Sequence, residues 1–458
     1  MNRADPEGKR LPIKLDTTSN GEFEPVPLWK HNLEANRLAH EAASVFSKKL
    51  SLGRREFLTS ACGAASTLLA FNAANAAAGK TGGFFELPKD AVLDQQLARA
   101  QVGSAKEEFI FDVQGHFIDT PKGNSKNSSV FLKDVFMDSD TDVMVLSFVP
   151  SKRDSEPVTI QAADTVRRMV EKLEGTHRLL LHGRVNPNQP GDLEGMDELK
   201  EKWGISAWKT YTQYGPGFKG FFLSDDVGIR FIEKARSLGV KNIAVHKGLP
   251  FGPFSYQHSQ CSDIGVVAKR FPDVNFLIYH SGYVTTATEQ AYDPKGGADG
   301  IDTLISSLEK NSVSPGSNVY AELGSTWRFL LRDPEQAAHA MGKLLKYCGE
   351  DNVLWGTDSI WYGSPQDQIQ AFRTFQIAPQ FRERHGYPEI TPAIRAKVFG
   401  LNAAKVYGLS PTEVKKYTRT DKVHKDKVAY QENPDPSFLT YGPKTRRQFL
   451  EYLRLTGG

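Results

Sequence analysis

The chain has 458 residues, of which 39% are hydrophobic and 24% are charged, and its formal net charge at pH 7 is +3. This length and apolar content are enough to bury a full core, and an α/β barrel of this size is within range as a single domain. A nearly neutral chain gives no reason to expect nucleic acid or another polyanion as a partner. The cysteines Cys62, Cys261 and Cys348 include no close pair, so neither a disulfide framework nor a thiolate metal site is expected.

The first eighty residues are expected to lie outside the catalytic fold. Residues 1–50 are polar and show no sustained period, which predicts a loosely structured leader. Arg54 and Arg55 then precede residues 59–78, a stretch of small and apolar residues without charge. Paired arginines ahead of a mildly hydrophobic region resemble a twin-arginine export signal, which residues 51–78 would form, with a short surface helix as the alternative.

If this signal works, the twin-arginine translocase is a partner and the protein acts in the periplasm or another extracytoplasmic compartment. Ala74-Asn75-Ala76 offers a small-x-small cleavage site, so the mature chain would begin near Ala77. The apolar stretch is too rich in Ala, Ser and Asn to predict a stable membrane anchor.

From residue 108 the sequence alternates between predicted strands and segments with helical periodicity. Continuous apolar runs such as Val143-Met144-Val145-Leu146 are typical of strands covered on both faces of a parallel sheet. Eight strands are predicted, at residues 108–116, 141–149, 178–185, 205–211, 240–246, 274–280, 318–323 and 352–358. This pattern predicts a (β/α)8 TIM barrel, with a doubly wound open sheet as the alternative. Residues 410–458 are polar and punctuated by proline, and are expected to form an appended tail.

Side chains able to bind a metal or a substrate stand at the ends of five of these strands. In a barrel the C-terminal strand ends face one mouth, so their side chains are expected to meet there. They are Gln114 and His116 on the first strand, Lys209 on the fourth, His246 on the fifth, His280 on the sixth and Asp358 on the eighth. Aromatic residues, among them Trp361, fill the loops that follow several strands. They suit an apolar or aromatic substrate, contacted by Trp361, or simply loop packing.

These strand ends resemble the amidohydrolase superfamily, and more closely its amidohydrolase-related branch, which includes aromatic-acid decarboxylases and lactone hydrolases. The most specific matches are His246, His280 and the Gly-Thr-Asp-Ser stretch at residues 356–359. The resemblance covers residues 108–409 and ends in a segment like the closing helix of that family. It implies a single catalytic TIM barrel, and a homodimer by the same likeness.

The resemblance also implies one divalent metal ion, Zn²⁺ or Mn²⁺, bound by His116, His246 and Asp358. The first strand of that family carries His-x-His or Glu-x-His, whereas Gln114 stands here, and its neutral amide oxygen is a weaker ligand. Lys209 matches the place of a carboxylated lysine in two-metal members. With Gln114 present, we expect instead a free amine in the pocket wall or in contact with an anionic substrate.

The implied chemistry is hydrolysis of an ester, lactone or amide in a small-molecule substrate. The cation would lower the pKa of bound water to roughly 7, Asp358 would take the water's proton, and His280 would polarise the carbonyl. The same residues could serve a metal-dependent, non-oxidative decarboxylase of an aromatic acid. Gln114 motivates a third hypothesis, a catalytically impaired barrel that binds a ligand.

Overall fold

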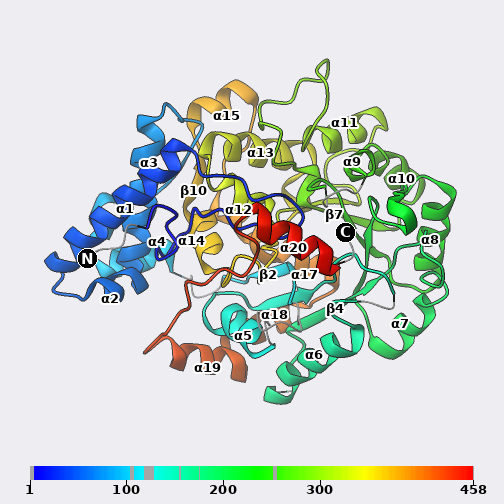
Figure 1. Cartoon of the computed structure of the whole chain (residues 1–458), viewed down its shortest axis with the longest axis horizontal. Helices are drawn as coiled ribbons and strands as arrows, with labels where there is room; N and C mark the ends of the chain where they lie inside the picture. Colours follow the sequence, from blue (N-terminus) through cyan, green and yellow to red (C-terminus); the bar gives the residue numbers. More distant parts are fainter. Residues whose placement is uncertain are drawn as a thin grey trace.

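An eight-stranded parallel sheet forms the centre of the molecule (Figure 1), in the order β2-β3-β4-β5-β6-β7-β8-β9. The computed structural model describes residues 5–103, 108–117, 128–153, 156–174, 176–250 and 255–456. The strands are β2 (Phe111–Gly115), β3 (Val143–Leu146), β4 (Leu179–Arg184), β5 (Ala207–Tyr211), β6 (Asn242–His246), β7 (Asn275–Tyr279), β8 (Val319–Glu322) and β9 (Val353–Leu354). Each lies within its predicted range.

Contacts between the first and last strands close this sheet into a barrel. Val113 N donates to Trp355 O at 3.0 Å and Asp358 N donates to Gln114 O at 2.9 Å, beside a parallel bridge between Gly115 and Ser359. The predicted (β/α)8 barrel is therefore confirmed, and the open sheet is wrong.

Helices surround the barrel and cover the outer face of its strands. In α8 (Asp226–Ser237) the apolar residues Phe231, Ile232 and Ala235 are buried, and Gly239 at φ +76° follows the helix end. The other helices of this part are α5 (Ser128–Leu132), α6 (Ile160–Glu174), α7 (Met196–Trp203), α9 (Tyr256–Ser259), α10 (Ile264–Arg270), α11 (Asp302–Lys310), α12 (Thr326–Leu330), α13 (Pro334–Tyr347), α14 (Gln366–Thr374), α15 (Pro379–His385), α16 (Pro392–Ala396) and α17 (Asn402–Tyr407).

Residues 5–50, for which the sequence predicts loose structure, are ordered. Residues 11–23, here called the N-terminal strap, run without regular secondary structure and are almost entirely buried. They are followed by α1 (Lys30–Lys49), whose buried face is made of Ala35, Ala39 and Ala43. Alanines at this spacing allow close helix packing but give a weak apolar signal, which explains why the sequence did not indicate this helix.

The segment that resembles an export signal forms α2 (Arg54–Thr59) and α3 (Ala61–Ala77), at the left of Figure 1. In α3, Cys62, Leu68 and Phe71 are buried, and the helix packs against α1 and α4 (Gln95–Val102). A short antiparallel two-stranded sheet, β1 (Gly83–Phe85) with β10 (Phe375–Ile377), joins this layer to the barrel. No helix in the described part of the chain combines the length and apolar character needed to cross a membrane.

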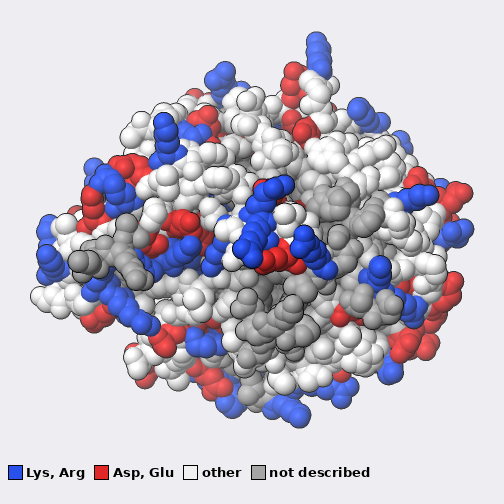
Figure 2. Space-filling model, viewed as in Figure 1, with Lys and Arg blue, Asp and Glu red and all other residues white. Residues whose placement is uncertain are grey.

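The C-terminal residues return to the barrel instead of extending from it. They form α18 (Pro411–Arg419), α19 (Lys422–Tyr430) and α20 (Arg446–Thr456). In α20, Phe449 and Leu453 are buried against Tyr211 and Tyr214 at the end of β5. Figure 1 shows α20 in red at the middle of the view, beside the dark-blue N-terminal strap. Acidic and basic side chains are interspersed over this face (Figure 2).

Candidate metal centre at the mouth of the barrel

Three buried histidines at the strand ends each have one ring nitrogen fixed by a backbone carbonyl. The pairs are His116 Nδ1 with Ser147 O at 3.0 Å, His246 Nε2 with Leu249 O at 3.0 Å, and His280 Nδ1 with Gly324 O at 2.6 Å. Because a carbonyl oxygen only accepts, the bonded nitrogen carries the proton and the other nitrogen keeps a lone pair. Histidines that bind metals are oriented by such bonds in the same way.

Burial keeps two of these rings neutral. It lowers the pKa of His280 to about 4 and that of His246 well below its usual value. At neutral pH both rings therefore offer a lone pair, as a metal ligand must.

His116 meets Gln114 and Asp358 in the first part of the site. His116 Nε2 lies 3.1 Å from Asp358 Oδ1, and Gln114 Nε2 donates to the same oxygen at 3.1 Å. The amide nitrogen of Gln114 is also 3.4 Å from His116 Nε2. In this orientation Gln114 fills the space between the histidine and the carboxylate with N–H groups, and its oxygen has no hydrogen bond among the described residues.

Asp358 is held as an ionised carboxylate. Its second oxygen, Oδ2, accepts from Ser325 Oγ at 2.6 Å and from Asn20 Nδ2 at 2.7 Å. Burial opposes ionisation, but the close contact with the His116 ring, the nearby His280 ring and the hydrogen bond from Ser325 outweigh it and lower the pKa of Asp358. Asp358 lies in the loop four residues after β9, where its backbone has φ +58°.

Glu22 of the N-terminal strap forms the second part of the site with His246 and His280. Glu22 Oε1 lies 3.3 Å from His246 Nδ1, and Glu22 Oε2 lies 3.3 Å from His280 Nε2. Neither nitrogen has a hydrogen-bond partner among the described residues. Burial, with the Asp358 charge nearby, raises the pKa of Glu22 well above its usual range. Asn20 Nδ2 joins the two parts, because it also donates to Glu22 Oε2 at 2.5 Å.

The second part fits a divalent cation. Within the described residues, Glu22, His246 and His280 bring one donor atom each to within 4.8 Å of one another. Ligand atoms about 2.0–2.1 Å from a tetrahedral ion lie roughly 3.3–3.4 Å apart, which is close to both Glu22–histidine distances of 3.3 Å. Two unpartnered lone pairs facing a carboxylate are the donor set that Zn²⁺ and similar ions prefer.

Two further predicted residues lie near this centre. Lys209 is fully buried, its Nζ has no hydrogen-bond partner among the described residues, and it lies 3.7 Å from the Tyr279 ring centre. Burial lowers the pKa of Lys209 to about 8. Trp361 is buried beside His116, with 6.5 Å between the ring centres.

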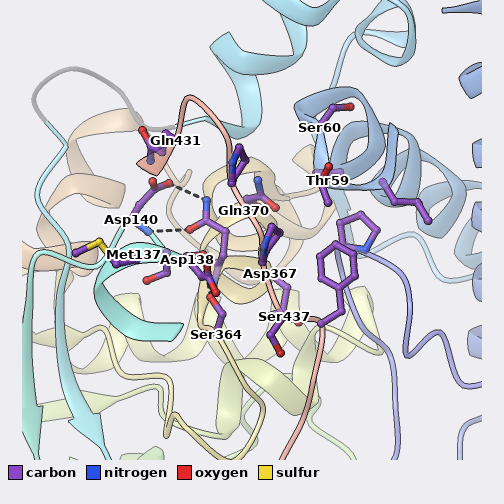
Figure 3. Close-up of a pocket in the computed structure, with 18 of the residues that line it drawn as sticks. Thr59, Ser60, Met137, Asp138, Asp140, Ser364, Asp367, Gln370, Gln431 and Ser437 are labelled. Carbon is purple, nitrogen blue, oxygen red and sulfur yellow. Dashed lines mark hydrogen bonds between the residues drawn. The ribbon is translucent and has the colours of Figure 1, made fainter. Parts of the chain in front are cut away.

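The sequence did not indicate Glu22 or Asn20 as site residues. Both lie in a polar stretch more than 200 residues from the histidines they approach, and neither belongs to a motif. The alternation of Leu11, Ile13 and Leu15 was the one local signal, since it is typical of a half-buried extended segment. A separate cavity of about 190 Å³, lined by residues such as Thr59, Asp140 and Asp367, contains none of the predicted site residues (Figure 3).

Comparisons with known proteins place these findings in context. The family model described as amidohydrolase matches residues 112–409. No curated protein matches the chain significantly.

Similar solved structures include 5-carboxyvanillate decarboxylase from Sphingomonas paucimobilis, with 13% identity over 66% of this chain and 99% of that one, and a TM-score of 0.40. Another is dihydroorotase from Saccharomyces cerevisiae, with 11% identity over 67% of this chain and 86% of that one, and a TM-score of 0.42. A third is 4-oxalomesaconate hydratase from Rhodopseudomonas palustris, with 14% identity over 67% of this chain and 98% of that one, and a TM-score of 0.37.

Proposed function

Because the chain belongs to the amidohydrolase family, we propose that it is a metal-dependent hydrolase that opens an ester, lactone or amide bond at a carbonyl carbon. One observation carries this proposal. Three buried histidines, each with one nitrogen bonded to a backbone carbonyl, turn their lone pairs toward two carboxylates at the mouth of the barrel. A divalent cation, when bound, lowers the pKa of a coordinated water to about 7 and polarises a carbonyl.

The residues of the chain supply the proton transfer and the positioning. Asp358 is ionised at neutral pH, so it can accept the proton of the attacking water. Its Oδ2 is fixed by Ser325 and Asn20. A base that is held in one orientation by two donors loses little conformational freedom when it acts.

The role of His280 follows from its hydrogen bond. Its Nδ1 proton is donated to Gly324 O, so the Nε2 that faces the site carries a lone pair and no proton. A nitrogen without a proton cannot donate to a developing oxyanion, and this favours a ligand role for His280 over the predicted carbonyl-polarising role. Burial lowers the pKa of the Lys209 amine to about 8. Lys209 is therefore a better candidate than His280 for contact with a carbonyl oxygen or a substrate carboxylate.

Decarboxylation of an aromatic acid is the second candidate, and Lys209 is the observation that favours it. Its Nζ is buried without a hydrogen-bond partner among the described residues, next to the rings of Tyr279 and Tyr211. The Lys209 amine could pair with the carboxylate of an aromatic acid, while the tyrosine rings contact its aromatic ring.

A substrate panel tests the two candidates. The full chain, loaded with Zn²⁺ or Mn²⁺, is assayed against aryl esters, lactones and amides, and in parallel against hydroxybenzoates with CO₂ detection. Hydrolysis of the first group, lowered roughly 10²–10⁴-fold by Asp358→Asn, is the expected result. Release of CO₂ with inert esters and lactones would assign the lyase instead. A metal-loaded chain that turns over neither group would support the ligand-binding barrel.

A further inference from the structure

We propose that the N-terminal strap completes the metal site, with Glu22 binding the cation together with His246 and His280. This inference rests on the proposed function, because it assigns a ligand to the same site. It goes beyond that function in giving the chain a ligand from outside the barrel. Within the barrel itself, Gln114 stands at the place of a ligand on the first strand, but its amide nitrogen, a hydrogen-bond donor, points toward His116 and Asp358.

Without a cation, the carboxyl group of Glu22 cannot satisfy both histidine nitrogens that face it. His246 Nδ1 and His280 Nε2 both carry lone pairs, and both face the same carboxyl group at 3.3 Å. A proton on that carboxyl group could satisfy one nitrogen and would leave the other unpaired in a fully buried place. Leaving a buried polar atom unpaired is costly, because its lost contact with water is not replaced. A single divalent cation satisfies both nitrogens and the carboxylate at once.

The strap is anchored by one buried ion-pair network, in which Arg328 also lies 3.5 Å from Asp367. Asp16 pairs with Arg328 at 2.9 Å, and Lys14 pairs with Asp367 at 3.2 Å, each pair being buried. Leu11, Ile13 and Leu15 are buried in the main apolar cluster. These contacts fix the approach of the strap, so that Glu22 reaches the histidines from a defined direction.

A tight turn aims Asn20 and Glu22 into the site together. Gly21 has φ +87°, and a Cβ at this position would lie 2.3 Å from the Tyr452 ring of α20, so only glycine fits. Glu22 N donates to Asn20 Oδ1 at 2.9 Å, which closes the turn. Asn20 Nδ2 then donates to both Glu22 and Asp358 and holds the two carboxylates next to each other. The turn therefore places a carboxylate at the lone pairs of His246 and His280.

The test is metal affinity in the full chain. Zn²⁺ binding is measured by competition with a chromophoric chelator for the wild type, Glu22→Gln and Glu24→Gln. Glu24 is the matched control, because it lies two residues away, is exposed and pairs with Arg446 on the surface. Loss of an outer-shell partner weakens metal binding about 10–100-fold, so loss of a ligand should weaken it by roughly 100-fold or more. Glu24→Gln should stay within about twofold of the wild type.

Co²⁺ provides a second readout that a structural role would not move. Replacing a ligand changes the visible d–d bands of bound Co²⁺, so Glu22→Gln should alter them and Glu24→Gln should not. Glu22→Asp keeps the charge but draws the carboxylate back by one methylene. We expect it to weaken Zn²⁺ binding at least tenfold, and it serves as the test should Glu22→Gln not fold.

The outcomes separate this inference from the proposed function. A wild-type chain that binds Zn²⁺, with unchanged affinity and bands in both Glu22 variants, would overturn the ligand role of Glu22 and leave the hydrolase proposal intact. If Zn²⁺ affinity and Co²⁺ bands are unchanged and Glu22→Gln also turns over substrate faster, the ligand role is overturned and the strap instead blocks access to the site. A wild-type chain that binds neither Zn²⁺ nor Co²⁺ would overturn both proposals.

Discussion

Replacing Asn20 with alanine is expected to destabilise the metal-free protein by about 2–4 kcal/mol. Asn20 Nδ2 donates to Glu22 Oε2 and to Asp358 Oδ2, at 2.5 Å and 2.7 Å, in a fully buried setting. A hydrogen bond to a charged group contributes about 1.5–3 kcal/mol and a neutral one about 0.5–1.5 kcal/mol. The variant also loses the bond that Asn20 Oδ1 accepts from Glu22 N, but Ser325 still donates to the same Asp358 oxygen and offsets part of the loss. The sum therefore stays near one charged and one neutral bond.

Thermal unfolding followed by circular dichroism measures this loss. At about 2.1 cal/mol/K per residue, the unfolding entropy of a chain this long is near 1 kcal/mol/K, so Asn20→Ala should lower the Tm by about 2–4 °C. Asn433→Ala is the control, because Asn433 is exposed. If both variants melt within about 1 °C of the wild type, Asn20 does not hold the two carboxylates in the way argued above.

Three other predictions concern single side chains. Lys209→Met should lower kcat/KM by roughly 10–100-fold for ionised substrates of the panel and less for neutral ones; equal losses would contradict a contact between Lys209 and an anion. Gly21→Ala should lower the Tm more than Gly79→Ala, because both have positive φ but only a Cβ at Gly21 meets the Tyr452 ring; equal losses would contradict that contact. Burial lowers the pKa of His339 to about 4, so between pH 6.5 and 4 only the unfolded chain binds this proton. The free energy of unfolding therefore decreases as the pH is lowered through this window, by roughly 1–2 kcal/mol after solvent screening. His339→Gln should flatten this slope in urea unfolding, and an unchanged slope would count against the assignment.

The barrel could be predicted because its determinants are local. Each strand is a short apolar run bounded by turn residues, and each helix repeats its apolar face, so the alternation can be recognised within a window of about fifteen residues. The ends of these strands carry His116, His246, His280 and Asp358, and the barrel brings all four to the same mouth. Fold topology converts such local positions into neighbours, which is why this part of the site was accessible from the sequence.

The rest of the site depends on contacts without a local signature. Asn20 and Asp358 are hydrogen-bonded across 338 residues of chain, and nothing in the sequence around Asn20 resembles a ligand motif. The small residues of α1 gave only a weak apolar signal, and the apolar run at residues 449–455 stood alone in a polar tail, although α1 and α20 both pack into the molecule. Segments that cover a barrel mouth pack against one irregular surface, so their apolar residues need not follow a regular helical or strand period.

The position of the strap bears on the predicted export signal. Cleavage after Ala76 would remove Asn20 and Glu22. A mature protein processed at that point therefore cannot have Glu22 in its metal site. In α2 and α3, Phe57, Leu58, Leu68 and Phe71 are buried, and α3 packs against β1 and α4, which would remain after cleavage. Burying four such side chains contributes about 6–12 kcal/mol, comparable with the whole stability of a domain at about 5–15 kcal/mol. We infer that the folded protein keeps these helices, and with them the carboxylate that faces the two histidines.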